Sequence, residues 1–316
     1  MFSTWQFRIG FLDIRFHMYA PQQKGLVDGF LNKLMMPTSI QPRAQCHLIA
    51  VKPNVPDERA LAIDLPESGR ILCQQMHKAW TTICRRGFGP DRMSMGELIL
   101  TSDFWIEPWD EAIPSLNLIG YHRDDQAYFF YFTRDDLNRI DGVRQYIHSL
   151  ATRWHVPEHG LVLHSSAVAH PKGGFLFLGE SGAGKSTVAR LAASAGIPVL
   201  SDDLVYLLFQ GDNQYPLSAA PSLSQTFSTH PERHPLLRAV FRLVQDDTDR
   251  LVRLPEIAVA KELYDAFSWT HWAQSLGPEK MAGAFAALTT AAQHVPGYEL
   301  HFRKTPDFWK MMDNEF

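Results

Sequence analysis

The sequence predicts an α/β protein with two domains, a nucleotide-binding domain at residues 156–316 and a smaller mixed α/β domain at residues 1–155. Three observations lead to this prediction. A glycine-rich loop follows an apolar run at residues 175–178 and precedes a helical pattern. A second apolar run, at residues 197–200, leads directly into two aspartates. Strand-like and helical patterns alternate along both halves, and residues 156–160, Val-Pro-Glu-His-Gly, interrupt them and mark the boundary.

The first domain combines strand-like and helical segments but carries no recognisable chemistry. Alternating apolar residues rich in β-branched and aromatic side chains predict strands, and apolar residues spaced three and four apart predict helices. The expected strands are residues 7–19, 46–51, 61–64, 104–107, 116–122 and 128–133. The expected helices are residues 26–35, 71–85 and 136–154, of which the last has the clearest apolar face.

The second domain begins with strand-like runs at residues 161–169 and 174–178, whose spacing predicts a hairpin that feeds the glycine loop. A helix is expected at residues 186–195, where Gly196 provides the usual C-terminal stop. Residues 246–250 are interpreted as a hairpin turn between two strands. The remaining expected elements are strands at residues 197–200, 204–209, 237–244 and 298–302 and a helix at residues 258–267.

Composition and charge exclude several classes of protein. The net charge of −4 provides no general surface for polyanions, so nucleic acid is not an expected partner. Three widely spaced cysteines (Cys46, Cys73 and Cys84) fit reduced thiols rather than a disulfide framework. The N-terminus lacks the pattern of a signal peptide, and no apolar run is long enough to span a membrane. A cytoplasmic protein is therefore expected.

The glycine loop fits the Walker A pattern, in which a glycine and four free positions precede Gly-Lys-Ser/Thr. Glycines let main-chain N–H groups wrap around phosphate oxygens, and the positive end of the following helix points to the same place. Lysine can reach the terminal phosphates, and the serine hydroxyl can bind Mg²⁺. The residues expected to bind the nucleotide are Gly179, Glu180, Ser181, Gly182, Ala183, Gly184, Lys185, Ser186 and Thr187.

Asp202 and Asp203 form the second candidate for chemistry. A right-handed crossover is expected to place the strand at residues 197–200 beside the strand at residues 175–178, so that both carboxylates open near the phosphate loop. Two carboxylates there can divide the work between a magnesium ion and a proton acceptor. The alternative interpretation is a solvated acidic pair that opens a turn.

His164 is a weaker candidate on its own, because a histidine on a strand is more often a packed or capping residue. The expected hairpin could return it toward the strand that enters the phosphate loop. In that position it could orient an aspartate or contact a phosphate.

Residues 163–168, the loop at residues 179–187 and residues 199–203 together resemble the catalytic domain of the HPr kinase/phosphorylase family. That family phosphorylates a protein serine and is related to phosphoenolpyruvate carboxykinases. Residues 234–243 and 297–302 resemble divergent members of the family found beside peptide-modifying systems. The resemblance implies a C-terminal P-loop kinase domain of the HPr kinase/PEP carboxykinase type.

The resemblance also implies roles for individual residues. Lys185 and Ser186 would hold phosphate and metal, Asp202 would act as general base, Asp203 would help to hold Mg²⁺, and His164 would support the site. The chain lacks the Glu-Ile-Arg-Gly-Leu-Gly segment that the family carries after its aspartates. The acceptor that the resemblance implies is therefore a serine on a peptide or protein rather than HPr in particular.

These observations favour an ATP- and Mg²⁺-dependent kinase that phosphorylates a serine-type hydroxyl. A kinase of a small hydroxylated metabolite is an alternative. A nucleotide-responsive module that binds a peptide without transferring phosphate is another, since it would need the loop but not a base at Asp202. Self-association is a further expectation from the resemblance.

Overall fold

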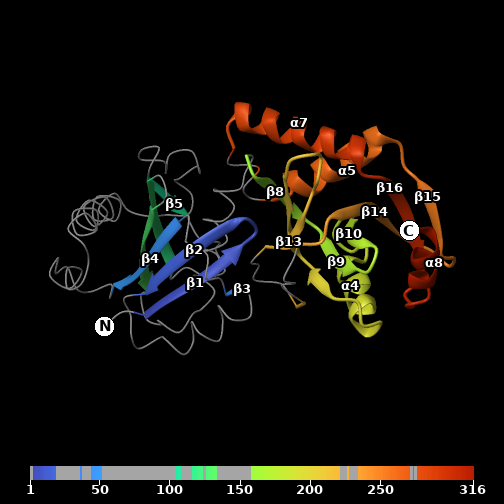
Figure 1. Ribbon diagram of the computed structural model, residues 1–316, viewed down its shortest axis with the longest axis horizontal. Coiled ribbons are helices and arrows are strands. Elements are labelled where there is room, and N and C mark those ends of the chain that lie inside the picture. Colours follow the sequence, from blue (N-terminus) through green and yellow to red (C-terminus); the bar gives the residue numbers. More distant parts are fainter. Residues whose placement is uncertain are drawn as a thin grey trace. The chain divides into compact units, whose positions relative to one another are not determined.

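The protein is described from a computed structural model (Figure 1). The structure describes residues 3–18, 36–37, 44–51, 104–107, 116–123, 126–133, 158–220, 226–227, 234–270, 273 and 276–316. The chain separates into two compact units, the first within residues 1–146 and the second comprising residues 147–316 with the short segments Ile9–Phe11 and Lys33–Met36. Within the described ranges, none of the helices combines the length and the apolar character that crossing a membrane requires.

The described part of the N-terminal half is a seven-stranded sheet with the order β3-β1-β2-β4-β7-β6-β5. The single strand expected at residues 7–19 is wrong, because Gly10 adopts a φ of 57° and the chain turns there between two neighbouring strands. The strands expected at residues 46–51, 104–107, 116–122 and 128–133 are confirmed. The strands are β1 (Ser3–Ile9), β2 (Leu12–Met18), β3 (Met36–Pro37), β4 (Ala44–Val51), β5 (Phe104–Glu107), β6 (Leu116–Arg123) and β7 (Gln126–Thr133).

Four expected elements of the first half lie outside the described residues. They are the helices at residues 26–35, 71–85 and 136–154 and the strand at residues 61–64. The helical part of the expected mixed α/β domain is therefore still a prediction.

The C-terminal unit is a mixed α/β region built around a six-stranded sheet with the order β11-β9-β10-β14-β16-β15. Its middle strands β10, β14 and β16 are parallel, whereas β9 and β15 run antiparallel to their neighbours. A separate three-stranded sheet has the order β13-β12-β8. The strands are β8 (Gly160–His164), β9 (Ser166–His170), β10 (Gly173–Leu178), β11 (Val199–Ser201), β12 (Leu204–Leu208), β13 (Leu217–Ala219), β14 (Leu237–Gln245), β15 (Arg250–Arg253) and β16 (Gly297–Phe302).

Alternation along the strands of the large sheet produces two cores, one on each face. Phe175 and Phe177 of β10 pack on one face with α4 (Lys185–Ser194) and α8 (Phe308–Glu315). Leu176 and Leu178 pack on the other face with α5 (Glu256–Ser268), α7 (Pro278–His294) and the three-stranded sheet. Figure 1 shows α5 and α7 on one side of the large sheet and α4 on the other. The phosphate loop thus leaves a strand that is buried on both faces.

Several elements of this unit confirm the sequence-based expectations. The helices expected at residues 186–195 and 258–267 are α4 and α5. The strands expected at residues 204–209, 237–244 and 298–302 are β12, β14 and β16. Helices α7 and α8 were not predicted from the sequence.

Three expectations for this unit are wrong. Residues 161–169 do not form one strand, because the chain changes sheets at Ser165, leaving β8 in the small sheet and β9 in the large one. The strand at residues 199–201 does not lie beside β10, because β9 lies between them. Residues 246–250 do not form a hairpin turn, because β16 lies between β14 and β15. In the last two cases a strand from elsewhere in the chain lies between the two strands that were expected to be neighbours.

Candidate functional site

The phosphate loop joins β10 to α4 and is held in a conformation that only glycine adopts readily. Gly182 and Gly184 have φ values of 85° and 113°, and Gly184 is the residue from which α4 starts. A Cβ atom on residue 184 would lie 2.8 Å from Cζ of the buried Phe302. From the other side, Gln245 at the end of β14 donates a hydrogen bond of 2.8 Å to the carbonyl of Gly182. The loop is thus fixed by backbone conformation and by two neighbouring strands.

Lys185 is the first residue of α4, and its side chain is buried beneath the loop, with 7% of the residue exposed. The ammonium group donates hydrogen bonds to the carbonyls of Gly179 (2.7 Å) and Glu180 (3.2 Å). Burial lowers the pKa of Lys185 below its usual value, and the nearby carboxylate of Asp203 opposes that shift. A cation held at a helix N-terminus inside a glycine loop is suited to bind terminal phosphates.

The two aspartates follow β11 and have different surroundings. Oδ1 of Asp202, a residue that is 6% exposed, accepts hydrogen bonds from the N–H groups of Thr226 (2.9 Å) and Phe227 (3.1 Å). Asp203 is the carboxylate near Lys185, and 17% of its side chain is exposed. Ser201 stabilises the turn, because its hydroxyl accepts hydrogen bonds from the N–H groups of both Asp203 and Leu204. The pair therefore does not behave as a solvated turn, since both carboxylates are largely buried.

β11 reaches the loop by a different route from the one expected. It is antiparallel to β9, which is antiparallel to β10, so β11 and β10 run in the same direction. Their carboxyl ends consequently open at the same edge of the sheet. The expected proximity of Asp203 and Lys185 is met, although the two strands are not neighbours.

His164 ends β8, where its register partner is Leu204 of β12. Its Nδ1 atom lies 3.4 Å from Oδ1 of Asp203. The expected hairpin that feeds the loop is formed by β9 and β10, but it does not include His164, because β8 belongs to the small sheet. His164 instead contacts the site through the residue that follows β11. It can therefore orient Asp203, one of the two roles considered from the sequence.

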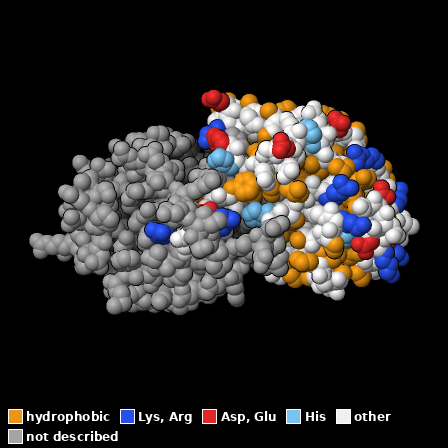
Figure 2. Space-filling view, viewed as in Figure 1, with side chains coloured by type: hydrophobic (Ala, Val, Ile, Leu, Met, Phe, Trp, Pro, Cys, Tyr) orange, Lys and Arg blue, Asp and Glu red, His pale blue; other side chains and the backbone are white. Residues whose placement is uncertain are grey.

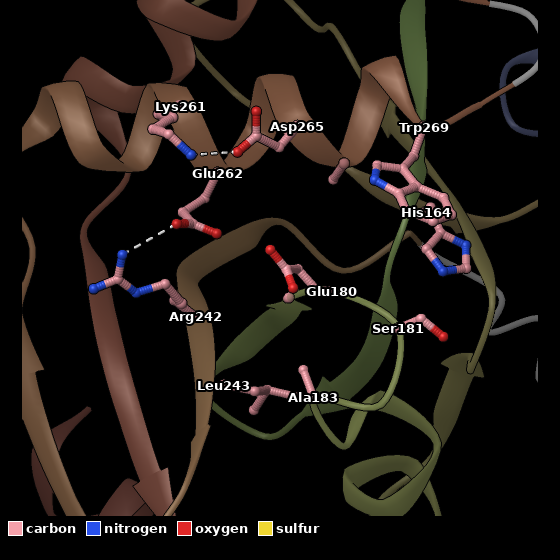
Figure 3. Close-up of a pocket in the computed structure, with 12 residues that line it drawn as sticks. His164, Glu180, Ser181, Ala183, Arg242, Leu243, Lys261, Glu262, Asp265 and Trp269 are labelled. Atoms are coloured by element: carbon pink, nitrogen blue, oxygen red, sulfur yellow. Dashed lines mark hydrogen bonds and ion pairs between the residues drawn. The ribbon is translucent and has the colours of Figure 1, made fainter.

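A pocket of about 550 Å³ adjoins the loop. One wall is formed by loop residues, which include Glu180 and Ser181, and by Arg242 of β14. The opposite wall is the polar face of α5 and the residue that caps it, Trp269. Figure 3 shows Glu262 descending from α5 and Glu180 rising from the loop toward the same space. His164 also lines the pocket, whereas Lys185, Asp202 and Asp203 do not.

Ion pairs between charged side chains connect and stabilise the pocket walls. Arg242 lies beside the last residue of β10, since Leu178 is its register partner, and pairs with Glu262 of α5 at 3.2 Å and with Glu299 of β16. On α5 itself, Lys261 pairs with Asp265 at 2.6 Å. The α5 wall was not predicted from the sequence. Its signals were polar residues spaced by four on the expected helix and Arg242, one of two arginines in the strand at residues 237–245.

A second polar cluster lies at the ends of β14 and β16. His301 contacts Asp246 at 2.8 Å through Nδ1 and Glu299 at 3.1 Å through Nε2. The hydrogen bond from His301, followed by those from the Asp247 N–H and from Arg250, lowers the pKa of Asp246 to about 2. Through Glu299, this cluster connects to Arg242 of the pocket wall.

The basic residues near the C-terminus lie elsewhere. Figure 2 shows lysine and arginine side chains gathered at one end of the described part of the molecule. Arg250 pairs with Asp246 and Arg303 pairs with Asp249, while Arg253 lies over the ring of Tyr298 at 5.0 Å. None of these three arginines lines the pocket. Their contacts fit a stabilised surface better than a phosphate site.

The structure thus brings Lys185, Asp203 and His164 together. Asp202 adjoins them, but its Oδ1 is occupied by backbone N–H groups. Ser186 is exposed at the start of α4. Among the described residues, no group of three or more histidine, cysteine, aspartate or glutamate side chains could by itself hold a metal ion.

A family model described as SynChlorMet cassette protein ScmC matches residues 134–316, which is more than half of the chain. No curated protein matches the sequence. The match covers the phosphate loop, the two aspartates and the α5 wall. The chain therefore belongs to the ScmC family of SynChlorMet cassette proteins.

Proposed function

We propose that this chain is an ATP-dependent kinase that transfers a phosphoryl group to a serine-type hydroxyl of a peptide or protein. One observation carries the proposal: a buried lysine inside a glycine loop at a helix N-terminus lies near a carboxylate at the same sheet edge. Phosphoryl transfer depends mainly on positioning and on charge stabilisation, and these groups can supply both. We further propose that residues 156–316 form a P-loop domain of the HPr kinase/PEP carboxykinase type.

The nucleotide phosphates would be bound by the loop from Gly179 to Thr187. Main-chain N–H groups and the positive end of the α4 dipole favour anions there. Lys185 is already held by two carbonyl groups, so nucleotide binding should cost little additional side-chain entropy. ATP would also remove the cost of leaving a buried ammonium group without a full counter-charge.

The residues present fit a magnesium ion. Mg²⁺ is usually held by one or two protein oxygens together with phosphate and water, so the lack of a larger metal cluster among the described residues agrees with it. The Ser186 hydroxyl and the Asp203 carboxylate would hold it. Bound to the phosphates, the ion would neutralise charge that develops during transfer. His164 would keep the Asp203 carboxylate in position.

Asp202 would act as general base. Two backbone N–H groups fix its Oδ1, which leaves Oδ2 to accept a proton. In the reaction the serine oxygen forms a bond to the γ-phosphorus while the bond from that phosphorus to the β–γ bridging oxygen breaks. The serine proton passes to Asp202, and ADP leaves with the bonding electrons.

Label transfer from γ-labelled ATP tests the proposal. The full chain is incubated with Mg²⁺ and a library of serine peptides, and with glycerol as a small hydroxylated acceptor. We expect labelled peptide from the wild-type chain. Transfer should fall at least about a hundredfold in each of the variants Lys185→Met, Asp203→Asn and Asp202→Asn. Full activity of Asp202→Asn would remove that residue from the base role.

Two outcomes would favour the other functions. Labelled glycerol without labelled peptide would indicate a kinase of small metabolites. Tight ATP binding without any labelled product would indicate a nucleotide-responsive binding module. Failure of the wild-type chain to bind ATP or ADP with magnesium would refute all three.

A further inference from the structure

The pocket borders the first residues of the phosphate loop and not the residues at the start of α4. The pocket is lined by four residues of the loop (Gly179, Glu180, Ser181 and Ala183) and not by Lys185, Ser186 or Thr187 at the start of α4. The side chains expected to hold the phosphates and the metal are thus separate from the pocket. A volume of about 550 Å³ is that of a small-molecule or peptide side-chain site and exceeds what a single hydroxylated metabolite of a few atoms fills.

The pocket is connected to the acid pair through His164. That residue lines the pocket and lies 3.4 Å from Asp203. A molecule bound in the pocket would therefore have one end at His164, which contacts Asp203. This is the relation expected between an acceptor and the groups that act on its hydroxyl.

The charges of the lining favour a cation. The Glu180 carboxylate is exposed and makes no hydrogen bond or ion pair with any described residue. Across the pocket, Glu262 shares its cationic partner, Arg242, with Glu299. Lys261 is already paired with Asp265. After these pairings the side chains that line the pocket retain an excess of negative charge.

An aromatic side chain at the pocket adds to this preference. The Trp269 ring is stacked on His164 with centroids 6.1 Å apart, and the residue is 64% exposed. An exposed indole beside carboxylates can contact an ammonium or guanidinium group through its face. Carboxylates and indole thus favour the same kind of ligand.

We propose that the pocket between the phosphate loop and α5 binds the acceptor, and that the acceptor is a peptide segment with a lysine or arginine near the serine. This inference rests on the proposed function. The basic side chain lies between Glu180 and Glu262 and against Trp269, while the serine hydroxyl lies at the His164 end. The terminal phosphates of the nucleotide would lie at Lys185 and the start of α4, which do not line the pocket.

The experiment compares matched serine peptides with labelled ATP. The peptides carry lysine, glutamine or glutamate at positions flanking the serine, and the variants are Trp269→Ala and Glu180→Gln in the full chain. Phe285→Ala is the matched aromatic control, because Phe285 is 53% exposed on α7 outside the pocket. Glu279→Gln, at an exposed acidic position in the first turn of α7, is the matched charge control.

The wild-type chain is expected to prefer lysine peptides over glutamate peptides by about tenfold or more in kcat/KM, with the difference mainly in KM. Trp269→Ala and Glu180→Gln are expected to reduce that ratio at least about threefold, whereas both control variants keep it. Equal use of the lysine and glutamate peptides by the wild-type chain would overturn the proposal and leave the kinase function intact.

Nucleotide binding provides the second arm. Trp269→Ala is expected to bind ATP and inorganic tripolyphosphate as the wild-type chain does, within about twofold. A loss of ATP affinity without a loss of tripolyphosphate affinity would assign the pocket to the nucleotide base and overturn the acceptor assignment. Absence of label transfer to every peptide by the wild-type chain would instead refute the kinase function, and this inference with it.

Discussion

Gly184→Ala tests how strictly the phosphate loop is constrained. Gly184 has a φ of 113°, and a Cβ atom there would lie 2.8 Å from Cζ of Phe302. Phe302 is fully buried, and its ring packs edge-on against Phe308 with centroids 5.8 Å apart. The ring therefore cannot move aside without disturbing the core beneath α8.

The expected loss of stability is the sum of two effects. Forcing an alanine into a positive φ costs about 1–2 kcal/mol, and inserting a methyl group into a filled core costs about 1–3 kcal/mol. Gly184→Ala should therefore lower the free energy of unfolding by about 2–5 kcal/mol. Gly196 provides the control, because its φ is 75° but an alanine Cβ at that position would meet no atom within 4 Å. Gly196→Ala should cost about 1–2 kcal/mol from strain alone.

Guanidinium unfolding of the full chain measures both variants, with hydrogen exchange of the β10 and β16 amides as the local readout. The reasoning also requires that Gly184→Ala weaken ATP binding while Gly196→Ala leaves it unchanged. Equal stability of the two variants, within about 0.5 kcal/mol, would refute the claim that Phe302 fixes the loop.

Three further predictions concern single side chains. Lys185→Met should leave the free energy of unfolding of the nucleotide-free protein within about 1 kcal/mol of wild type, because the cost of the buried charge is removed together with its two hydrogen bonds. Its ATP affinity, measured by calorimetry, should fall at least about tenfold. Gln245→Ala removes the bond to the carbonyl of Gly182 and should weaken ATP binding about two- to fivefold with a stability change below about 1 kcal/mol. Asp246→Asn should destabilise the protein at pH 7. Because folding lowers the pKa of Asp246 from 3.8 to about 2, that difference should shrink as the pH falls through this window in acid unfolding experiments.

The sequence was sufficient for the loop and for the elements that carry a strong local period. The Walker A pattern places Lys185 and Ser186 correctly at the start of α4, since loop and helix are adjacent in the chain. The strand at residues 237–244 and the helix at residues 258–267 followed from apolar periodicity. These features depend on neighbours in sequence, which a single chain displays directly.

The pairing of strands was harder to predict from the sequence. Residues 161–169 form a strand-like run that is apolar except at residues 164–166. The chain passes from one sheet to another at Ser165, whose N–H donates a hydrogen bond to the carbonyl of Asp203. The polar residues 164–166 are compatible both with one long strand and with two short strands in different sheets. The same limit applies to β11 and β15, because β11 pairs with β9 and β15 with β16, strands that are far from them in sequence.

The α5 wall shows why part of the site escaped prediction. Lys261, Glu262 and Asp265 look like an ordinary solvated helix face in sequence, and surface ion pairs of that kind contribute little to stability. They become candidates only because α5 packs against the sheet face that carries Arg242. Holding charged side chains on both walls of the pocket costs free energy, because the groups lose water and side-chain freedom.

The burial of Lys185 gives the strongest physical reason to regard this region as a ligand site. Its ammonium group is kept beneath the loop by carbonyl dipoles, and burial lowers its pKa even though Asp203 lies near. A fold selected for stability alone would place an apolar side chain at this position, since a methionine fills the same space without a desolvation cost. The lysine is favoured over methionine once a polyanion occupies the loop, because the phosphate oxygens then add counter-charge to that of the nearby Asp203. Stability measured with and without ATP therefore tests the site independently of any acceptor: nucleotide should raise the unfolding free energy of the wild-type chain and leave that of Lys185→Met nearly unchanged.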